Sequence, residues 1–185
     1  KIQKDILSRG ADELKLVMDD GKPFQDSLQT AKAIAEAVGT IGQYDLVLCG
    51  MGSSDLYFQE VGVQVGELLG VPALNNITGI KPAGEGVLEV ERTLEDEVEV
   101  LEVPLPAVLS VSSEINTPSV PAMRDIMRAG KKPVDKLDCQ GGGEPSLRIL
   151  QQLAPQQQER RKELVEGDGE EAVDALVRFL KKEGF

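Results

Sequence analysis

The stretch that decides the fold is Asp45-Leu46-Val47-Leu48-Cys49-Gly50-Met51-Gly52-Ser53-Ser54-Asp55. Its first part, 45–49, is an almost continuous apolar run, which is typical of a parallel strand covered on both faces. Its second part is a turn rich in glycine and serine. After this turn, apolar residues recur with helical spacing until Gly70. The stretch therefore predicts a buried strand, a loop and a helix.

The same order begins earlier in the chain. Residues 14–18 predict a short strand, and Ser27 is a candidate N-cap for a helix closed by Gly39 and Gly42. Residues 1–10 resemble the end of another helix. Strands that alternate with helices predict an α/β fold with a mostly parallel sheet and right-handed crossovers.

The next segment, 73–111, has a different character. It contains short strand-like runs, and the tip Glu95-Asp96-Glu97 predicts a β-hairpin. Between residues 85 and 114 there are nine acids and one base, which contributes −8 to the total charge of −12. The simplest interpretation is a solvated hairpin face. The predicted strands are 73–80, 87–94, 98–103 and 107–111.

The remainder of the chain divides into a basic helix and a tail. Residues 124–136 hold five bases and two acids, and Gly130 ends the predicted helix there. A linker follows, with Gly141-Gly142-Gly143, a Gln-rich run and a short helix at 145–153. The predicted last helix has Asp168 as its cap and an apolar stripe of Val173, Leu176, Val177 and Leu180.

Length and spacing divide the chain into two parts. We expect an α/β domain of the nucleotide-binding type at 1–137, and a linker with a helical arm at 138–185. The arm is expected to pack on its own domain or on a partner.

Composition excludes several functions. The 185 residues include no His, so neither a His base nor a His-ligated metal is available from this chain. Two cysteines cannot build a disulfide framework or a structural zinc site. A charge of −12 disfavours nucleic-acid binding. With no membrane span and no signal peptide in the sequence, we expect a cytoplasmic protein.

The loop after the strand at 45–49 is the first candidate site. Its backbone N–H groups lie at the carboxyl end of a parallel strand, where such sheets bind ligands. A plain strand-to-helix turn explains the glycines equally well. Cys49 lies in an apolar strand and is expected to be an inert buried thiol. We find no catalytic constellation and no metal site in the sequence.

Met123 and the basic residues behind it form the second candidate site. An exposed methionine beside cations suits docking of an acidic partner. The spacing of Met123, Ile126 and Met127 is equally compatible with packing in a core. The spacing alone leaves both interpretations open.

One long motif carries a resemblance to a known family. Residues 90–110 read Val-Glu-Arg-Thr-Leu-Glu-Asp-Glu-Val-Glu-Val-Leu-Glu-Val-Pro-Leu-Pro-Ala-Val-Leu-Ser. This segment resembles the signature of electron transfer flavoprotein β subunits. Glu97 departs from it, because Gly or Asp is usual there. The phrases Asp5–Gly10, Gly52–Tyr57 and Glu166–Glu171 are most similar to the FixA branch. Family members begin with a first strand, whereas this sequence starts in the helix that follows it.

The resemblance implies a Rossmann-like electron carrier subunit, not an enzyme. Such β subunits pair with an α (FixB-like) subunit that holds the redox FAD. They bind AMP or, in bifurcating members, a second FAD. The heterodimer takes electrons from a flavin dehydrogenase and passes them to an acceptor such as a quinone reductase. Relatives in the FixA branch serve nitrogen fixation or anaerobic carnitine reduction.

The resemblance also implies roles for particular residues. The nucleotide-binding candidates are Gly50, Ser53, Ser54, Asp55, Gln59 and Gly62. The family's dehydrogenase-docking anchor corresponds to Met123, and two of its lysines correspond to Arg128 and Lys131. The bulky Leu56-Tyr57-Phe58 leaves open AMP, a second FAD or no nucleotide at all.

Two further functions remain as alternatives. The first is a free-standing module that binds an adenine nucleotide and has no redox role. The signature at 90–110 and the arm at 156–185 argue against it. The second is a scaffold subunit without nucleotide, which only Leu56-Tyr57-Phe58 favours.

Overall fold

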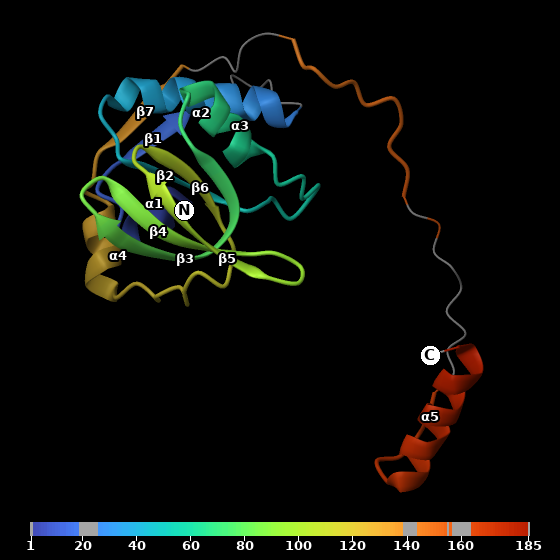
Figure 1. Cartoon of the computed structure of the whole chain (residues 1–185). Helices are drawn as coiled ribbons and strands as arrows, with labels where there is room; N and C mark the ends of the chain where they lie inside the picture. Colours follow the sequence, from blue (N-terminus) through green and yellow to red (C-terminus); the bar gives the residue numbers. More distant parts are fainter. Residues whose placement is uncertain (1, 19–25, 139–143, 155, 157–163, 185) are drawn as a thin grey trace. The chain divides into compact units, whose positions relative to one another are not determined.

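The computed structural model describes residues 2–18, 26–138, 144–154, 156 and 164–184. The chain forms two compact units, Lys1–Arg148 and Ile149–Phe185, and each is described by itself. Gly141-Gly142-Gly143 and the Gln pair 157–158 of the predicted linker lie outside the described residues. Figure 1 labels the elements along the chain.

The first unit contains four helices and seven strands among its described residues. The helices are α1 (Ile2–Ser8), α2 (Ser27–Ile41), α3 (Val61–Leu69) and α4 (Met123–Ala129). The strands are β1 (Leu14–Val17), β2 (Leu46–Gly50), β3 (Ala73–Gly84), β4 (Val87–Thr93), β5 (Val98–Pro104), β6 (Ala107–Val111) and β7 (Val134–Leu137). The second unit contains α5 (Glu170–Glu183).

The main sheet has five strands in the order β2-β6-β3-β4-β5. The pairs β2–β6 and β6–β3 are parallel, whereas β4 pairs antiparallel with both β3 and β5. The antiparallel strands are the acidic hairpin segment, added to one side of the parallel strands (Figure 1). This arrangement confirms the predicted α/β class, with a mostly parallel sheet and an inserted hairpin.

The core lies on both faces of β6. Val108 packs with Ala31 of α2 and Val65 of α3 on one face. Leu109 packs with Ile77 and Val90 on the other face. Successive residues of a strand point to opposite faces, so a strand covered on both sides is apolar throughout. The run at 107–109 meets this condition, because all three residues are fully buried.

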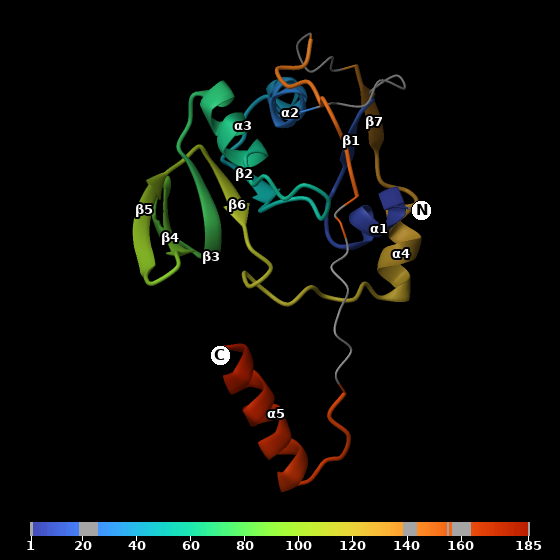
Figure 2. The same cartoon turned by 90° about the vertical axis from the view of Figure 1, so that its right-hand side faces the viewer.

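β2 is an edge strand of this sheet. Leu48 is 57% exposed, whereas Leu109, its partner across the β2–β6 pair, is 0% exposed. A separate parallel pair, β1–β7, stands apart from the five-stranded sheet. Helix α2 packs on both, with Ala31 beside β2 and β6 and Ala37 beside Val17 and Leu137. Figure 2 shows the two groups of strands separated below this helix.

Three local predictions are wrong. Asp26 caps α2 instead of Ser27, because its side chain accepts a hydrogen bond from the backbone N–H of Gln29. α2 passes through Gly39 and ends at Gly42. The second error is the cap of α5, which is Gly169 instead of Asp168.

The third error is the short helix predicted at 145–153, which is not helical. Its Ile149, Leu150 and Leu153 are exposed, so no packing supports a helix there. Isolated helices of this length are marginal in water, so apolar spacing alone does not produce one.

Helix α5 has the predicted amphipathic pattern. Within its own unit, the stripe of Val173, Leu176, Val177 and Leu180 packs on no other helix or strand that the structure describes. Acidic residues lie in its first turn and lysines in its last, which complements the helix dipole. Among the described residues, none of the helices has the length and apolar character needed to cross a membrane.

Candidate functional sites

The loop between β2 and α3 lies where the sequence places the nucleotide site. It starts at the carboxyl end of β2, beside the parallel strand β6. Five of the six candidate residues belong to this segment, and all but the half-buried Gln59 are exposed. They are Gly50, Ser53, Ser54, Asp55 and Gln59. The structure therefore gathers most of the predicted residues in one loop.

The polar groups of this loop are engaged with one another. The Ser53 hydroxyl donates to the Asp55 carboxylate, and the backbone N–H of Leu56 donates to the same oxygen at 2.8 Å. These bonds stabilise the ionised form, so the Ser53 hydroxyl, followed by the Leu56 N–H, lowers the pKa of Asp55. At neutral pH the turn carries a negative charge, which disfavours a phosphate beside it.

Tyr57 lies over the glycine of this turn. A Cβ added to Gly52 would sit 2.8 Å from the Tyr57 ring, so the ring packs directly against the Gly52 backbone. Tyr57 and Gln59 both have positive φ, 52° and 59°, which costs a residue with a side chain of the order of 1 kcal/mol. Of the bulky residues Leu56-Tyr57-Phe58, Tyr57 therefore closes the turn, whereas Leu56 and Phe58 are exposed.

The far end of the loop is fixed to α2. The Ser27 hydroxyl donates to the Glu60 carboxylate at 2.7 Å, and the Gln64 amide donates to the Ser27 oxygen at 3.2 Å. Ser27 thus joins α2 to the start of α3. Next to it, Asp26 accepts hydrogen bonds from the backbone N–H groups of Ser146 and Leu147, at 2.5 and 3.2 Å.

Gly62 is separate from the other candidates, because it is buried in α3 against β6. A Cβ added there would lie 2.0 Å from the Ser110 hydroxyl oxygen. Gly62 therefore allows a helix and a strand to approach closely. Its lack of a side chain has a packing reason that needs no ligand.

Cys49 lies in β2 and is partly buried. Burial raises the pKa of its thiol, because the thiolate is poorly solvated there. At neutral pH the side chain is a neutral thiol with weak nucleophilicity. The geometry agrees with the inert role expected from the sequence.

The second candidate site is the outer face of α4. Met123 is 73% exposed, which resolves the question that spacing left open. Arg128 and Lys131 are exposed too, and neither side chain forms a hydrogen bond or ion pair with a described residue. The buried residue of this helix is Ala129. The structure thus brings Met123, Arg128 and Lys131 together on a free surface.

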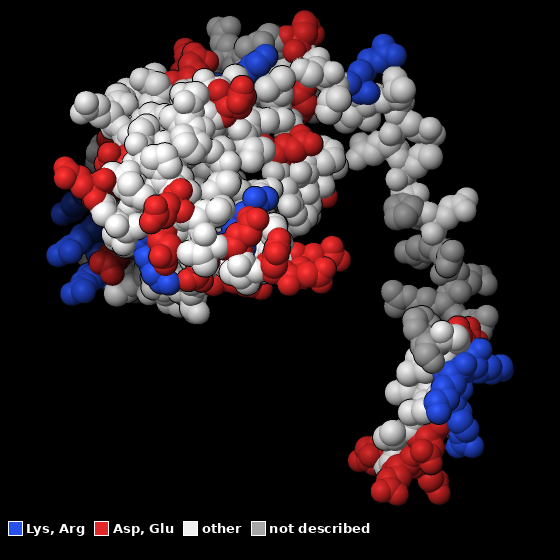
Figure 3. Space-filling view, viewed as in Figure 1, with Lys and Arg blue, Asp and Glu red and all other residues white. Residues whose placement is uncertain are grey.

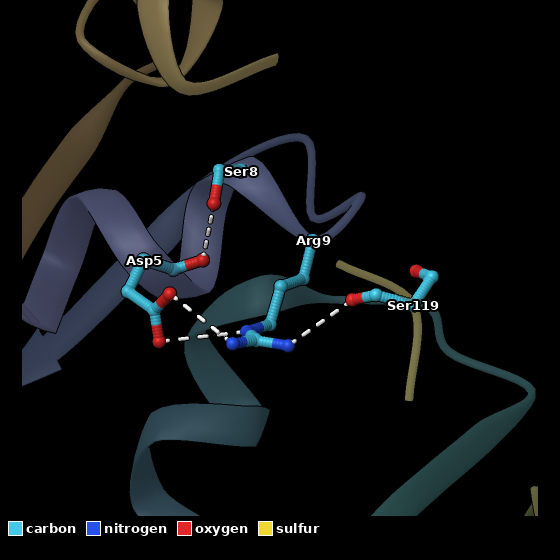
Figure 4. Close-up of polar contacts among 4 residues, drawn as sticks. All are labelled: Asp5, Ser8, Arg9 and Ser119. Atoms are coloured by element: carbon cyan, nitrogen blue, oxygen red, sulfur yellow. Dashed lines mark hydrogen bonds and ion pairs between the residues drawn. The ribbon is translucent and has the colours of Figure 1, made fainter. Parts of the chain in front are cut away.

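α1 holds this helix and the segment before it. The Arg9 guanidinium donates to the backbone carbonyl of Ser119 at 3.3 Å and pairs with Asp5, also at 3.3 Å (Figure 4). The Lys132 ammonium donates to the backbone carbonyls of Leu7 and Ala11, at 3.0 and 2.5 Å. Lys132 therefore has a structural role, whereas Arg124 of the same segment contacts only its neighbour Asp125, at 3.8 Å, among the described residues.

The carboxylates of the acidic hairpin are partly paired with cations on both faces of the sheet. On one face, Lys81 pairs with Glu91 at 2.8 Å and with Glu89 at 3.6 Å. On the other face, Arg92 forms an ion pair with Glu99 at 3.5 Å, and its guanidinium donates a hydrogen bond to the side-chain oxygen of Asn75 at 3.1 Å. The Nε atom of Arg92 is buried and has no hydrogen-bond acceptor among the residues that the structure describes. The sequence identified this arginine only as part of a motif.

Charge is separated on the surface of the first unit. In Figure 3 the acidic side chains cluster around the hairpin, and basic side chains gather at the opposite edge, near α4. Among the described residues, no group of three or more His, Cys, Asp or Glu side chains is arranged to hold a metal ion.

One comparison with known families adds to this geometry. Residues 1–140 match the model described as the electron transfer flavoprotein domain. The match spans most of the chain and includes both candidate sites.

Proposed function

Because the chain belongs to the electron transfer flavoprotein family, we propose that it is the β (FixA-like) subunit of a cytoplasmic electron-carrying heterodimer. An α (FixB-like) subunit would hold the redox FAD, and this chain would orient that FAD and dock a flavin dehydrogenase. Electrons would pass from the docked dehydrogenase to the FAD, and then to an acceptor such as a quinone reductase.

The face of α4 is the observation that carries the docking role. Met123 is held outward by a helix whose opposite side is anchored on α1. The exposed cations Arg128 and Lys131 follow it along the chain. An apolar side chain beside cations favours a fast and short-lived complex with an acidic surface. An electron carrier that meets several partners needs a complex of this kind.

The proposal assigns no proton chemistry to this chain. The chain contains no His, and the partly buried thiol of Cys49 is neutral at physiological pH. The role is that of a carrier subunit, which positions a cofactor and a partner. Its own side chains are not required to form or break covalent bonds.

A nucleotide in the loop after β2 does not fit the present arrangement. The Asp55 carboxylate is ionised there and Tyr57 covers Gly52, so a phosphate meets a negative charge and a ring. AMP or a second FAD therefore requires the segment 51–58 to open. We derive no step through a nucleotide held by this chain.

Two structural roles belong to the same proposal. The arm at 138–185 would pack on the α subunit, and the apolar stripe of α5 supports this. The FixA-branch fold has a first strand, which would pair with the edge strand β2. Exposed Leu48 would be covered by such a strand.

A free-standing adenine-nucleotide module is the alternative function. The loop at the carboxyl end of the parallel strand β2 favours it, because ligands bind at this edge of such sheets. Such a module would ignore an α-type subunit and would have no use for the exposed face of α4.

One experiment separates the two functions. The chain is expressed with and without an α-type subunit of the family, purified, denatured, and the released nucleotides are identified. A yellow heterodimer that releases FAD is expected. A colourless protein that ignores the α subunit and releases AMP or ATP would establish the alternative instead.

A further inference from the structure

Helix α4 exposes two methionines on one face. Met123 and Met127 are 73% and 70% exposed, and they lie four residues apart, so they are neighbours on the helix surface. The other two methionines are less accessible, because Met18 is 37% exposed and Met51 is partly buried. The most accessible thioethers of the chain are therefore adjacent.

The helix is held so that this face stays outward. Ala129, on the opposite side, is 2% exposed, and α1 packs beside α4. Lys132 fixes the end of this segment to carbonyls of α1, and Arg9 fixes Ser119 before it. Met127 thus extends the surface of Met123 by one turn and cannot turn into the core.

A stripe of cations runs beside the methionines. Arg124 and Arg128 are also four residues apart, and Lys131 continues the stripe. On a chain of net charge −12 this is a locally positive surface. Charge complementarity favours one kind of partner for this surface, a protein whose binding face has an apolar hollow and an acidic rim. In the proposed function this is the flavin dehydrogenase.

Exposed thioethers have a defined reaction with peroxide. A methionine sulfur loses two electrons and gains one oxygen atom, and hydrogen peroxide is reduced to water. The product is a polar sulfoxide. Placing an uncompensated polar group in an apolar hollow is unfavourable and weakens the contact. Peroxide itself forms when a reduced flavin transfers two electrons and two protons to O₂.

We propose that Met123 and Met127 together form an oxidation-sensitive docking surface, on which peroxide weakens the binding of the flavin dehydrogenase by converting both thioethers to sulfoxides. This inference rests on the proposed function, and it adds a second anchor, Met127, and a modification site. A carrier whose reduced flavin leaks electrons to O₂ would thereby lower its own electron intake. Methionine sulfoxide reductases would restore the surface with electrons from a thiol.

The test uses the heterodimer and a flavin dehydrogenase that has been reduced by its substrate. This dehydrogenase then reduces the flavin of the heterodimer. The heterodimer is treated with hydrogen peroxide, and peptide mass spectrometry follows the sulfoxide at each methionine. We expect Met123 and Met127 to oxidise before Met18 and Met51. The second-order rate constant of flavin reduction should fall roughly tenfold, in step with that oxidation, and a sulfoxide reductase should restore it.

Two variants separate this effect from general damage. The double variant Met123→Leu/Met127→Leu cannot form sulfoxide on α4, so peroxide should leave its rate constant at the value before treatment. The matched variant Met18→Leu should start at the wild-type rate and stay as sensitive to peroxide as the wild type.

Two results would overturn the inference while the proposed function stands. One is complete sulfoxidation of Met123 and Met127 with no fall in the rate constant of flavin reduction. This result counts when the heterodimer accepts electrons before treatment. The other is equal sensitivity of the Met123→Leu/Met127→Leu variant. Failure of every dehydrogenase to reduce the untreated heterodimer would instead reject the proposed function, and the inference with it.

Discussion

The loop between β2 and α3 and the outer face of α4 are both exposed, but they offer very different surfaces. In the loop, Ser53 and the N–H of Leu56 donate to Asp55, and Tyr57 covers Gly52. At α4, the side chains of Arg128 and Lys131 form no hydrogen bond or ion pair with a described residue, and Met123 is exposed. Exposure alone therefore does not make a site available. The loop must rearrange to bind a ligand, whereas α4 needs no rearrangement to dock a partner.

The largest expected effect tests whether Gly62 belongs to the loop or to the core. Gly62→Val places side-chain atoms where the Ser110 hydroxyl already lies, 2.0 Å from the first of them. Because the core is close-packed, we expect a loss of about 3 kcal/mol in the free energy of unfolding. Urea denaturation of the purified chain measures this loss.

Gly50→Ala is the matched control at the other end of the loop. No atom lies within 4 Å of the position where its Cβ would be. Its free energy of unfolding should therefore stay within about 0.5 kcal/mol of the wild type. Equal stability of the Gly62 and Gly50 variants would refute the packing role of Gly62.

The next effect tests the free cations of α4. Arg128→Glu reverses a charge beside Met123, so we expect electron transfer from the dehydrogenase to slow roughly tenfold at low salt. The difference from wild type should shrink as ionic strength rises, because salt screens exposed charges. Lys136→Glu, the same change on β7, should have a much smaller effect. Similar losses of rate for both variants would mean that electron transfer depends on the net charge of the chain and not on the position of Arg128.

A smaller effect concerns the closed loop. Tyr57→Gly removes the ring that covers Gly52 and places glycine where φ is 52°. If the ring must leave before a nucleotide binds, affinity for AMP should rise about fivefold, the equivalent of about 1 kcal/mol. Titration calorimetry with AMP measures this, with Phe58→Gly as the control. A weaker affinity for the Tyr57 variant would mean that the ring stacks on the nucleotide instead.

The smallest effect concerns Asp26, next to the serine that fixes the loop. Asp26→Ala should cost about 1 kcal/mol, because the cap to the Gln29 N–H is lost. Asp26→Asn keeps an acceptor for Gln29 but loses the negative charge that binds Ser146 and Leu147. It should lie between the wild type and the alanine variant in stability.

The same variants have a defined pH dependence. The Gln29 N–H, with those of Ser146 and Leu147, lowers the pKa of Asp26 below its ordinary value of 3.8. The stabilisation is therefore complete above pH 3.8 and is lost as pH falls through the lower folded value. Denaturation curves of wild type and Asp26→Ala should converge only in that acidic range. A constant difference down to the lowest pH would contradict the assignment.

The parallel strands could be predicted because their signal is local. The run at 107–109 is covered on both faces, whereas Leu48 in the run at 46–49 is exposed. Each run is apolar enough to predict a strand by itself. β7 could not be found in this way. It contains two charged residues in four, and its partner β1 lies 120 positions earlier, as in the pair Leu14 and Val134. Pairing over such a distance depends on the whole fold.

The candidate sites show the same limit. The spacing of Met123 and Met127 fits a core stripe, and only the packing of the small Ala129 on α1 decides which side faces outward. Sequence could place Asp55 in a loop, but not the ring of Tyr57 over Gly52. In both cases the missing information is a contact between residues that periodicity does not describe.

The most direct test of the central claim is stopped-flow reduction of the flavin in the assembled heterodimer. The heterodimer is mixed with a panel of substrate-reduced flavin dehydrogenases, and the flavin absorbance is followed for wild type and Met123→Glu. We predict that at least one dehydrogenase reduces the wild-type flavin rapidly, and that the variant, which keeps its flavin, is reduced at least tenfold more slowly. Equal rates for both proteins, or no reduction by any dehydrogenase, would contradict the account.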